Sequence, residues 1–344
     1  MSQQNTLRKG FTRPAFTSIA ITTVILFAIC AVFVPSSLDP ISVVGMMPFA
    51  AVLAIASIGQ TLVIQQRGID LSAAGVISIS AMGFGVMYSR WGIDPFTAVL
   101  LCFGISAVVG LANGLLVALV GISPLVATLA MNTILFGFVQ LITGGAPAQA
   151  PEVFSQFAQS DIFGISTLVW IAIVTVLVMA LLTSKTVSGR QFIAAGANPA
   201  AARVNGVRTN SSVILAYVTA ALTYSFAGML LASYLQNVGV QVGNGYMLAV
   251  IATVIVGGTP LAGGKGTIIG SAIAALFMSQ LVQMVLTMGA PTSVQMLVQA
   301  LTIAVAATLQ GVSGNFKFKE KKKPLHPSQI VTTDTESVGV HHMP

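Results

Sequence analysis

The stretch that organises this chain runs from Thr183 to Asn210 and reads TSKTVSGRQFIAAGANPAAARVNGVRTN. It is the longest polar interval between apolar runs that are almost free of charge, and it contains four basic residues and no acidic one. Within it, Asn198 suits the cap of a short helix, Pro199 its first position and Gly206 a left-handed exit. A helix of about two turns is unstable alone in water. We therefore predict that it docks, either on its own chain or on another protein.

The composition indicates an integral membrane protein. Of the 344 residues, 55% are hydrophobic and only 7% are charged, whereas soluble domains carry about 25% charged residues. The mean hydropathy of +0.92 agrees, so we expect an all-α, polytopic bundle of membrane helices. The formal charge of +7 does not indicate nucleic-acid binding, because the cations flank apolar runs instead of forming a basic face. Cys30 and Cys102 lie inside apolar runs, where packing is the expected role.

Ten apolar runs are candidates for crossing about 30 Å of hydrocarbon, which takes roughly 20 residues in a helix. They cover residues 15–34, 41–65, 71–89, 95–119, 123–142, 163–183, 212–235, 246–257, 267–289 and 292–311. The run 15–34 is predicted to be a retained first span, because it is too long for a signal peptide and lacks a cleavage pattern. The run 123–142 carries Pro124 and suits a partly broken or re-entrant span. The run 246–257 is short and suits a half-helix or a tilted crossing.

The distribution of charge supports this count. With ten spans and an internal N-terminus, only Arg90 of the fifteen cations lies outside. This positive-inside pattern predicts that both termini are cytoplasmic. The expected organisation is a cytoplasmic N-terminus (1–14), a transmembrane domain (15–312) with a cytoplasmic segment at 184–210, and a disordered basic tail (313–344).

No catalytic or metal-binding constellation stands out, so we predict a protein that is not an enzyme and holds no cofactor or metal. Histidine is confined to the tail, and Gly258–Thr267 lacks the spacing of a phosphate-binding loop. No span carries a central charged residue, whereas ion-coupled carriers usually need one. The uncharged polar groups of the spans suit a neutral, hydroxyl-rich solute. Energy for uphill transport is then expected from a partner ATPase.

A second polar site follows the run that ends at residue 65. Asp70 can cap the next helix together with Ser72, pair locally with Arg67, or line a polar cavity. Three further polar residues inside apolar runs are predicted either to line the solute pathway or to form interhelical hydrogen bonds: Asn113, Thr128 and Asn132.

Six motifs, taken in order, resemble the permease subunits of bacterial ABC importers for monosaccharides, of the ribose, xylose and arabinose type. They are Gly68–Ser72 (GIDLS), Asn113–Val117 (NGLLV), Pro124–Leu129 (PLVATL), Leu141–Gly145 (LITGG), Gly196–Arg203 (GANPAAAR) and Val256–Thr267 (VGGTPLAGGKGT). The resemblance covers roughly residues 45–312. Two positions depart from the family pattern: Arg67 stands where a glycine is common, and Ala73-Ala74 replaces Val-Gly.

The resemblance implies a permease of the bacterial inner membrane that works as a homodimer or pseudo-dimer with a second permease subunit. It further implies two cytoplasmic ATP-binding subunits and a periplasmic sugar-binding protein that delivers a neutral monosaccharide. The segment around Gly196–Arg203 would be the coupling helix that sits in a groove of the ATPase. The residues predicted to serve this coupling are Gly189, Arg190, Gly196, Asn198, Pro199, Ala202, Arg203 and Gly206.

The first hypothesis is therefore the membrane subunit of an ATP-driven monosaccharide importer. An alternative is a stand-alone facilitator or secondary carrier, which would move solute in liposomes without ATPase subunits. A membrane enzyme acting on lipid-linked substrates is disfavoured, because proton transfer needs a titratable group and the spans carry none at their centres.

Overall fold

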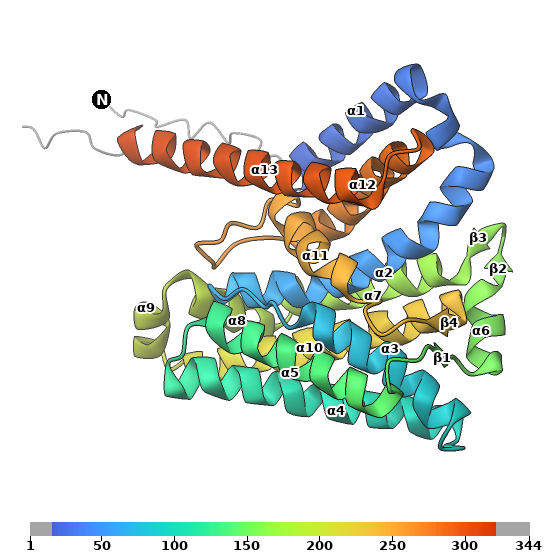
Figure 1. Cartoon of the computed structure of the whole chain (residues 1–344). Coiled ribbons are helices and arrows are strands. Elements are labelled where there is room, and N and C mark those ends of the chain that lie inside the picture. Colours follow the sequence, from blue (N-terminus) through green and yellow to red (C-terminus); the bar gives the residue numbers. More distant parts are fainter. Residues whose placement is uncertain (1–15, 321–344) are drawn as a thin grey trace, which may run out of the picture.

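The computed structural model describes residues 16–320, with side chains as far as residue 308. Its described part is almost entirely helical, with two short two-stranded sheets, and Figure 1 shows the helices gathered into one bundle. The predicted N-terminal segment 1–14 lies outside the described residues. Helix α13 (Thr292–Glu320) continues past residue 312, where the membrane domain is predicted to end, and the rest of the basic tail is not described.

Six helices of the described chain are long and apolar enough to cross a membrane. They are α2 (Pro40–Gln65), α4 with its π-helical continuation η2 (Pro95–Val120), α5 (Pro124–Thr143), α7 (Thr167–Lys185), α10 (Thr209–Leu235) and α12 (Ile268–Thr287). Four shorter apolar helices are α1 (Thr17–Phe33), α3 (Ala73–Ser89), α11 (Asn244–Val256) and the first part of α13 (Thr292–Thr308). Each of the ten predicted runs thus holds one apolar helix. The bundle is confirmed as all-α and polytopic.

The run 123–142 is one uninterrupted helix, α5, so the suggested break is wrong. Pro124 occupies the first helical position, where its missing N–H removes no intrahelical bond and its fixed φ suits the helix. The run 246–257 forms the short helix α11 of 13 residues, as its length indicates. A single turn of 3₁₀ helix, η1 (Pro35–Leu38), joins α1 to α2.

Helix α10 packs against α2, α3 and α4, and glycines on those partners set the close approach. A Cβ on Gly59 of α2 would lie 2.6 Å from the Cα of Ala220, and one on Gly110 of α4 would lie 2.6 Å from the Tyr217 carbonyl oxygen. Small residues at such crossings let helix backbones touch, which is how membrane helices gain packing energy without a hydrophobic driving force. Outer helices α4 and α5 instead expose large apolar side chains, such as Leu100 and Leu141, as lipid-facing helices do.

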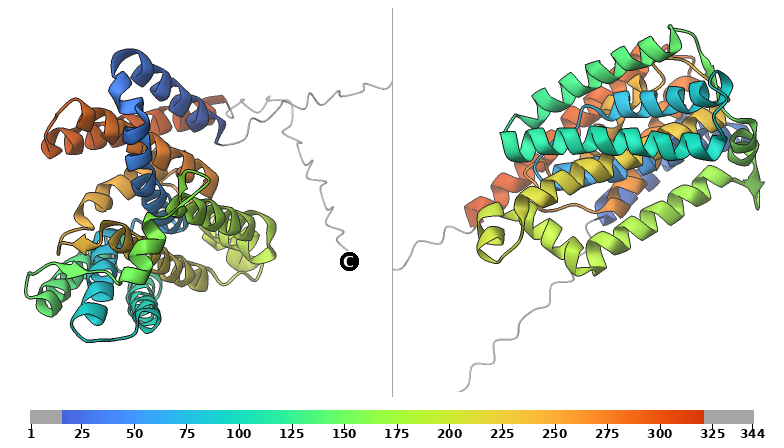
Figure 2. Two further views of the ribbon diagram at one scale, coloured as in Figure 1. Left: turned by 90° about the vertical axis from the view of Figure 1, so that its right-hand side faces the viewer. Right: turned by 90° about the horizontal axis from the view of Figure 1, so that it is seen from below.

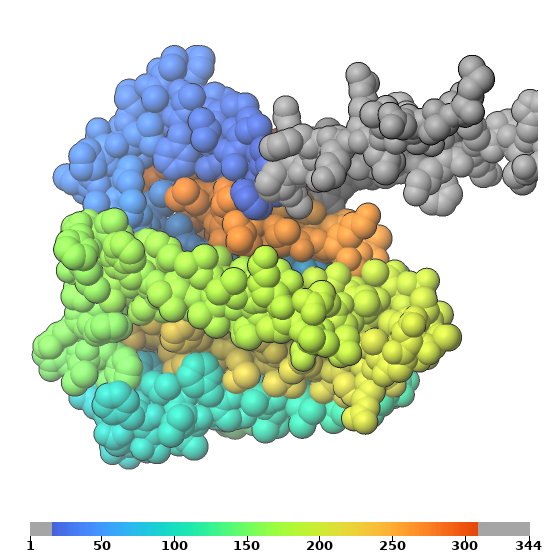
Figure 3. All heavy atoms as spheres, turned by 180° about the vertical axis from the view of Figure 1, so that it is seen from behind, coloured from blue at the N-terminus to red at the C-terminus, as the bar shows by residue number. Residues whose placement is uncertain are grey.

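The two ends of the bundle carry opposite charge. One end holds α6 (Glu152–Gln159) and the strand pairs β1 (Ala148–Gln149) with β4 (Asn237–Val238) and β2 (Asp161–Ile162) with β3 (Ile165–Ser166). Glu152 and Asp161 lie there. The other end holds α8 (Val187–Ala197) and α9 (Pro199–Val204) within residues 184–210, a segment with four cations and no acid. Figures 1 and 2 show the two groups of elements at opposite ends. In Figure 3, residues from about 150 to 210 form a continuous band from one end to the other.

Candidate coupling site and the buried linker beside it

The polar interval 184–210 folds into two helices, α8 (Val187–Ala197) and α9 (Pro199–Val204). Only the second was expected. Thr186 caps α8, because its side chain accepts a hydrogen bond from Gly189 N at 3.0 Å. A signal for α8 exists in the sequence: a threonine cap followed by Phe192, Ala195 and Gly196 on one face, all of which are buried.

Helix α9 has the ends that its sequence predicts. The side chain of Asn198 accepts a hydrogen bond from Ala201 N at 3.1 Å, Pro199 is the first helical residue, and Gly206 adopts a left-handed φ of 79°. The helix projects from the bundle (Figure 1). Ala202 is its one buried residue, whereas Val204 is 88% exposed. A short, capped helix therefore presents most of its surface outward.

The corner between α7 and α8 holds two more of the predicted coupling residues. Gly189 is buried against the end of α7, where a Cβ would overlap the carbonyl oxygens of Leu182 and Thr183. Arg190 donates to the Lys185 carbonyl oxygen at 3.1 Å. Both residues thus fix the direction in which α8 leaves the membrane helix.

Gly196 seats the C-terminal end of α8 directly on the C-terminal end of α2. A Cβ at this position would overlap the carbonyl oxygen of Gln65. Beside it, Gln66 Nε2 donates to the Phe192 carbonyl oxygen at 2.7 Å, and the Gln65 carbonyl accepts from Gly264 N at 2.8 Å. The end of α2, the α8–α9 corner and the glycine-rich loop 257–267 therefore meet at one point.

Arg67 joins these segments with its side chain. Nε donates to the Gly196 carbonyl oxygen at 2.7 Å, and Nη2 donates to the Ala197 carbonyl oxygen at 2.5 Å. The suggested local pair with Asp70 is thus replaced by hydrogen bonds to α8. The backbone of Arg67 is left-handed, with a φ of 65°, a conformation that glycine adopts without strain.

Residues 66–72 form a linker between α2 and α3, and they are held by side chains from other helices. Asp70 Oδ1 accepts from Ser72 N at 2.8 Å and from Ser72 Oγ at 2.5 Å, and Asn113 Nδ2 donates to the same hydroxyl at 3.0 Å. Thr128 Oγ1 accepts from Leu71 N at 2.9 Å. Asn132 Oδ1 accepts from Gly75 N at 2.7 Å, just inside α3. The structure thus brings all five predicted polar residues to this linker and the helix that follows it.

Asp70 is a buried carboxyl group with uncharged hydrogen-bond partners. It is 1% exposed, and burial raises the pKa of its carboxyl to about 6, although the two hydrogen bonds from Ser72 oppose this shift. The side-chain amide of Gln60 in α2 hydrogen-bonds to both the N–H and the carbonyl group of Asp70. With the amide oriented to satisfy its neighbours, Gln60 donates to the Asp70 carbonyl oxygen at 3.1 Å and accepts from Asp70 N at 3.3 Å. The linker is therefore locked against α2 as well.

Comparison with known proteins identifies the family. Residues 42–307 match the family described as the permease component of branched-chain amino acid transport systems. The chain belongs to this family. The permease is 32% identical to the ribose import permease of Bacillus subtilis (strain 168) over 83% of this chain and 89% of that protein. It is also 32% identical to a probable ABC transporter permease of Sinorhizobium fredii, over 89% and 92% of the two chains.

A further relative is the autoinducer 2 import system permease of Yersinia pestis (strain Pestoides F). It is 34% identical to this permease over 67% of this chain and 66% of that protein. No solved structure matches the chain. The family thus rests on sequence similarity that covers most of the transmembrane domain.

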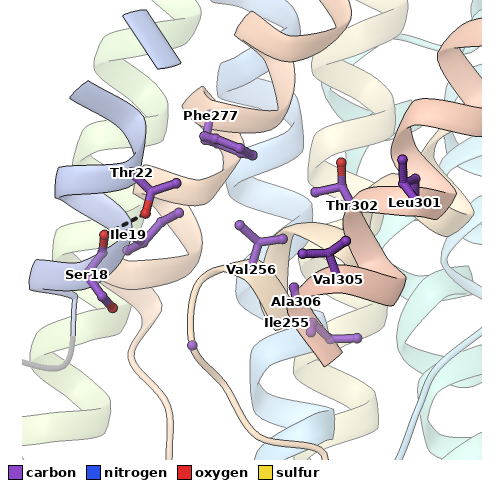
Figure 4. A pocket seen from close by; sticks show the side chains of 11 residues that line it. Ser18, Ile19, Thr22, Ile255, Val256, Phe277, Leu301, Thr302, Val305 and Ala306 are labelled. Carbon is purple, nitrogen blue, oxygen red and sulfur yellow. Dashed lines mark hydrogen bonds between the residues drawn. The ribbon is translucent and has the colours of Figure 1, made fainter. Parts of the chain in front are cut away.

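The permease contains two cavities among α1, α2, α11, α12 and α13. One, of about 630 Å³, has mainly apolar walls, including Ile19, Phe277 and Leu301 in Figure 4. The other, of about 280 Å³, lies between α2, α11, α12 and α13. It combines two aromatic rings with hydroxyl and amide groups, from Phe49, Tyr246, Ser279, Gln283 and Gln299. Across the described side chains, no group of three His, Cys, Asp or Glu residues is placed to hold a metal.

Sequence reasoning missed the receiving side of the coupling segment. Gln65, Gln66 and Gly264 contact α8 and its end, yet nothing in their local sequence predicts this. Arg67 did carry a signal, since an arginine in place of glycine marks a position with an unusual backbone. The remaining contacts join segments more than a hundred residues apart and become visible only in the fold.

Proposed function

We propose that this permease is the membrane-spanning subunit of an ABC importer for a neutral monosaccharide, with α9 as the helix that docks on a cytoplasmic ATP-binding subunit. A second copy of the permease completes the pore, and a periplasmic binding protein delivers the sugar. The relatives support this assignment, because they are named as a ribose import permease and a probable ABC transporter permease. The protein has no chemistry of its own in this proposal.

The observation that carries the proposal is the way α9 is held. Its outer face is exposed, with Val204 88% exposed. Its inner end is tied through Gly196 and Arg67 to the end of α2 and to the linker 66–72. A force applied to α9 by a closing ATPase would therefore reach α2 and α3 directly. An exposed helix without these contacts would transmit little of that force to α2 and α3.

The proposed topology has ten crossings, both termini in the cytoplasm and the α9 end of the bundle facing the cytoplasm of the cell. The charges support it. Lys185, Arg190, Arg203 and Arg208 gather at the α9 end, whereas Asp94, Glu152 and Asp161 belong to connections at the strand end. Membrane proteins retain basic segments on the cytoplasmic side. Importers of this kind reside in the bacterial inner membrane.

The cavity of about 280 Å³ supports a neutral solute. Aromatic faces at Phe49 and Tyr246 offer a platform for the C–H face of a sugar ring, and amides at Gln283 and Gln299 can both donate to and accept from hydroxyl groups. None of the described side chains that line this cavity is charged. A charged solute would lack a counter-charge there.

Reconstitution tests the proposal. The permease is placed in liposomes with its ATP-binding subunits, and uptake of labelled ribose and ATP hydrolysis are measured with the binding protein present. Val204→Asp adds a charge to the exposed face of α9 and is expected to lower stimulated hydrolysis and uptake at least about tenfold, because a charge left unpaired in an interface costs more than about 1.4 kcal/mol.

The matched control is Val187→Asp, the same change at an exposed residue of the first turn of α8, where a negative charge is favourable. Normal transport by Val204→Asp contradicts the docking assignment. Ribose uptake by the permease without any ATP-binding subunit supports the stand-alone facilitator instead.

A further inference from the structure

A small polar cavity lies beneath α9, and the proposed coupling mechanism does not use it. Its volume is about 270 Å³. Its wall is built from the linker 66–72, η2, the beginning of α5, the α8–α9 corner and the beginning of α10. It therefore touches the coupling helix on one side and three elements of the transmembrane bundle on the other.

The walls of this cavity are electropositive. Arg67 and Arg203 line it, and none of the described lining residues is acidic. Helix α10 begins in its wall at Thr209, and no described side chain caps the N–H groups at the start of this helix. The first N–H groups of a helix lack intrahelical partners and carry partial positive charge. Two guanidinium groups and one uncapped helix start thus face the same cavity.

A buried hydroxyl group completes the wall. Tyr217 is 1% exposed, lines the cavity, and its Oη has no hydrogen-bond partner among the described residues. Gly68 stands in front of it, since a Cβ at Gly68 would lie 2.5 Å from that oxygen. Leaving a buried hydroxyl unpaired costs free energy. A ligand oxygen that accepts a hydrogen bond from Tyr217 Oη would offset this free-energy cost. The nearby carboxyl of Asp70 is engaged by Ser72.

We propose that this cavity binds a small phosphate-bearing anion. Guanidinium groups match the geometry of phosphate oxygens, and helix starts are ready-made anion sites. The volume is just below the range of pockets for drug-sized ligands, which favours inorganic phosphate or a sugar phosphate over a nucleotide. The phosphate contacts Arg203 of α9 and Arg67 of the linker together. If α9 is the coupling helix, as proposed above, the bound anion holds it in its present position and restrains transport.

Binding to the purified full-length permease tests this site without any ATPase. The protein is placed in nanodiscs of zwitterionic lipid, and its thermal unfolding midpoint and calorimetric binding are measured with inorganic phosphate, ribose 5-phosphate and ribose. Both anions are expected to raise the midpoint, with an effect that falls as salt rises, and ribose 5-phosphate is expected to raise it more than ribose does. Equal shifts with ribose and ribose 5-phosphate would overturn the proposal.

Three variants locate the binding. Arg203→Gln is expected to weaken ribose 5-phosphate binding about tenfold, because it removes a charge-assisted hydrogen bond. Tyr217→Phe removes a neutral donor and is expected to weaken it about fivefold. Lys185→Gln removes a cation at the end of α7, outside the cavity, and is expected to leave affinity unchanged. Equal weakening by Lys185→Gln and Arg203→Gln would mean a diffuse surface effect and would refute the site.

Nanodiscs containing anionic phospholipid separate the two sources of phosphate. If a lipid headgroup occupies the cavity, anionic lipid raises the unfolding midpoint of the wild type but not of Arg203→Gln, and soluble phosphate causes no further increase. If the ligand is a soluble phosphate, it raises the midpoint in both kinds of lipid. No response to soluble phosphate or to anionic lipid overturns the proposal. That result leaves the docking of α9 untouched, and a failure of Val204→Asp to uncouple transport leaves the anion site untouched.

Discussion

Arg67 Nε donates to the carbonyl oxygen of Gly196 over 2.7 Å, from a residue whose own backbone is left-handed. Two demands meet in this residue. The turn after α2 requires a positive φ, which favours glycine, and the end of α8 gains a donor that glycine lacks. The arginine accepts backbone strain at the linker and gains two hydrogen bonds to the α8–α9 corner.

Arg67→Gly is expected to separate stability from coupling. Glycine relieves roughly 1 kcal/mol of left-handed strain, which offsets much of the loss of the two hydrogen bonds. The apparent unfolding midpoint should therefore stay close to that of the wild type, while ATP hydrolysis stimulated by the binding protein falls. Arg67→Ala loses the same hydrogen bonds and keeps the strain, so it should be less stable than Arg67→Gly by about 1 kcal/mol.

Arg67→Lys provides the control for charge, because it retains a cation without the two-pronged donor geometry. If hydrolysis in Arg67→Gly remains fully coupled to transport, the hydrogen bonds to Gly196 and Ala197 do not carry the motion of α9.

Gly196 and Gly206 are expected to differ sharply in their tolerance of alanine. A Cβ at Gly196 would overlap the backbone oxygen of Gln65, which cannot move without shifting α2 or α8, so Gly196→Ala should cost about 3 kcal/mol. Gly206 faces open space and suffers only from its φ of 79°, so Gly206→Ala should cost about 1 kcal/mol. Thermal unfolding and limited proteolysis of 184–210 measure both. Equal effects of the two substitutions would contradict the packing of α8 on α2.

These glycines also show where sequence reasoning succeeds and where it stops. The turn at Gly206 and the cap at Asn198 are local, and both were predicted because a helix end needs particular residues within a few positions. The role of Gly196 depends on Gln65, which lies far away in the sequence and becomes its neighbour only through the folding of α2, α7 and α8. The same holds for the polar residues around Asp70. Their chemistry is visible in the sequence, but their convergence on one linker is a property of the bundle.

Asp70→Asn is expected to remove a pH dependence of stability. Burial raises the pKa of the Asp70 carboxyl from 3.8 to about 6, so the folded state holds the proton more tightly than the unfolded chain does. The stabilising contribution is complete below about pH 4 and is lost as the pH rises through about 6. The groups near the carboxyl are uncharged. They belong to Ser72, Asn113, Gln60, Tyr217 and Tyr224.

The wild type should therefore gain up to about 3 kcal/mol between about pH 7 and pH 4 from this one group. The amide introduced by Asp70→Asn keeps an acceptor oxygen for the donors of Ser72, so the variant should fold and should lack this gain. Unfolding midpoints of both proteins across this pH range isolate the group, because every other titrating residue is shared. Parallel pH profiles would show that Asp70 does not titrate in the folded protein.

Cysteine labelling tests the orientation of the whole bundle. Val204 on α9 is 88% exposed and Phe163 at the strand end is 94% exposed, whereas the native thiols Cys30 and Cys102 are buried. In intact cells, a membrane-impermeant maleimide that passes the outer membrane should modify Phe163→Cys and leave Val204→Cys unmodified. When the permease is produced without its ATP-binding subunits and the inner membrane is permeabilised, both should react at similar rates, because both side chains are exposed in the free permease. Modification of Val204→Cys in intact cells would place α9 on the periplasmic face, where no ATP-binding subunit can reach it.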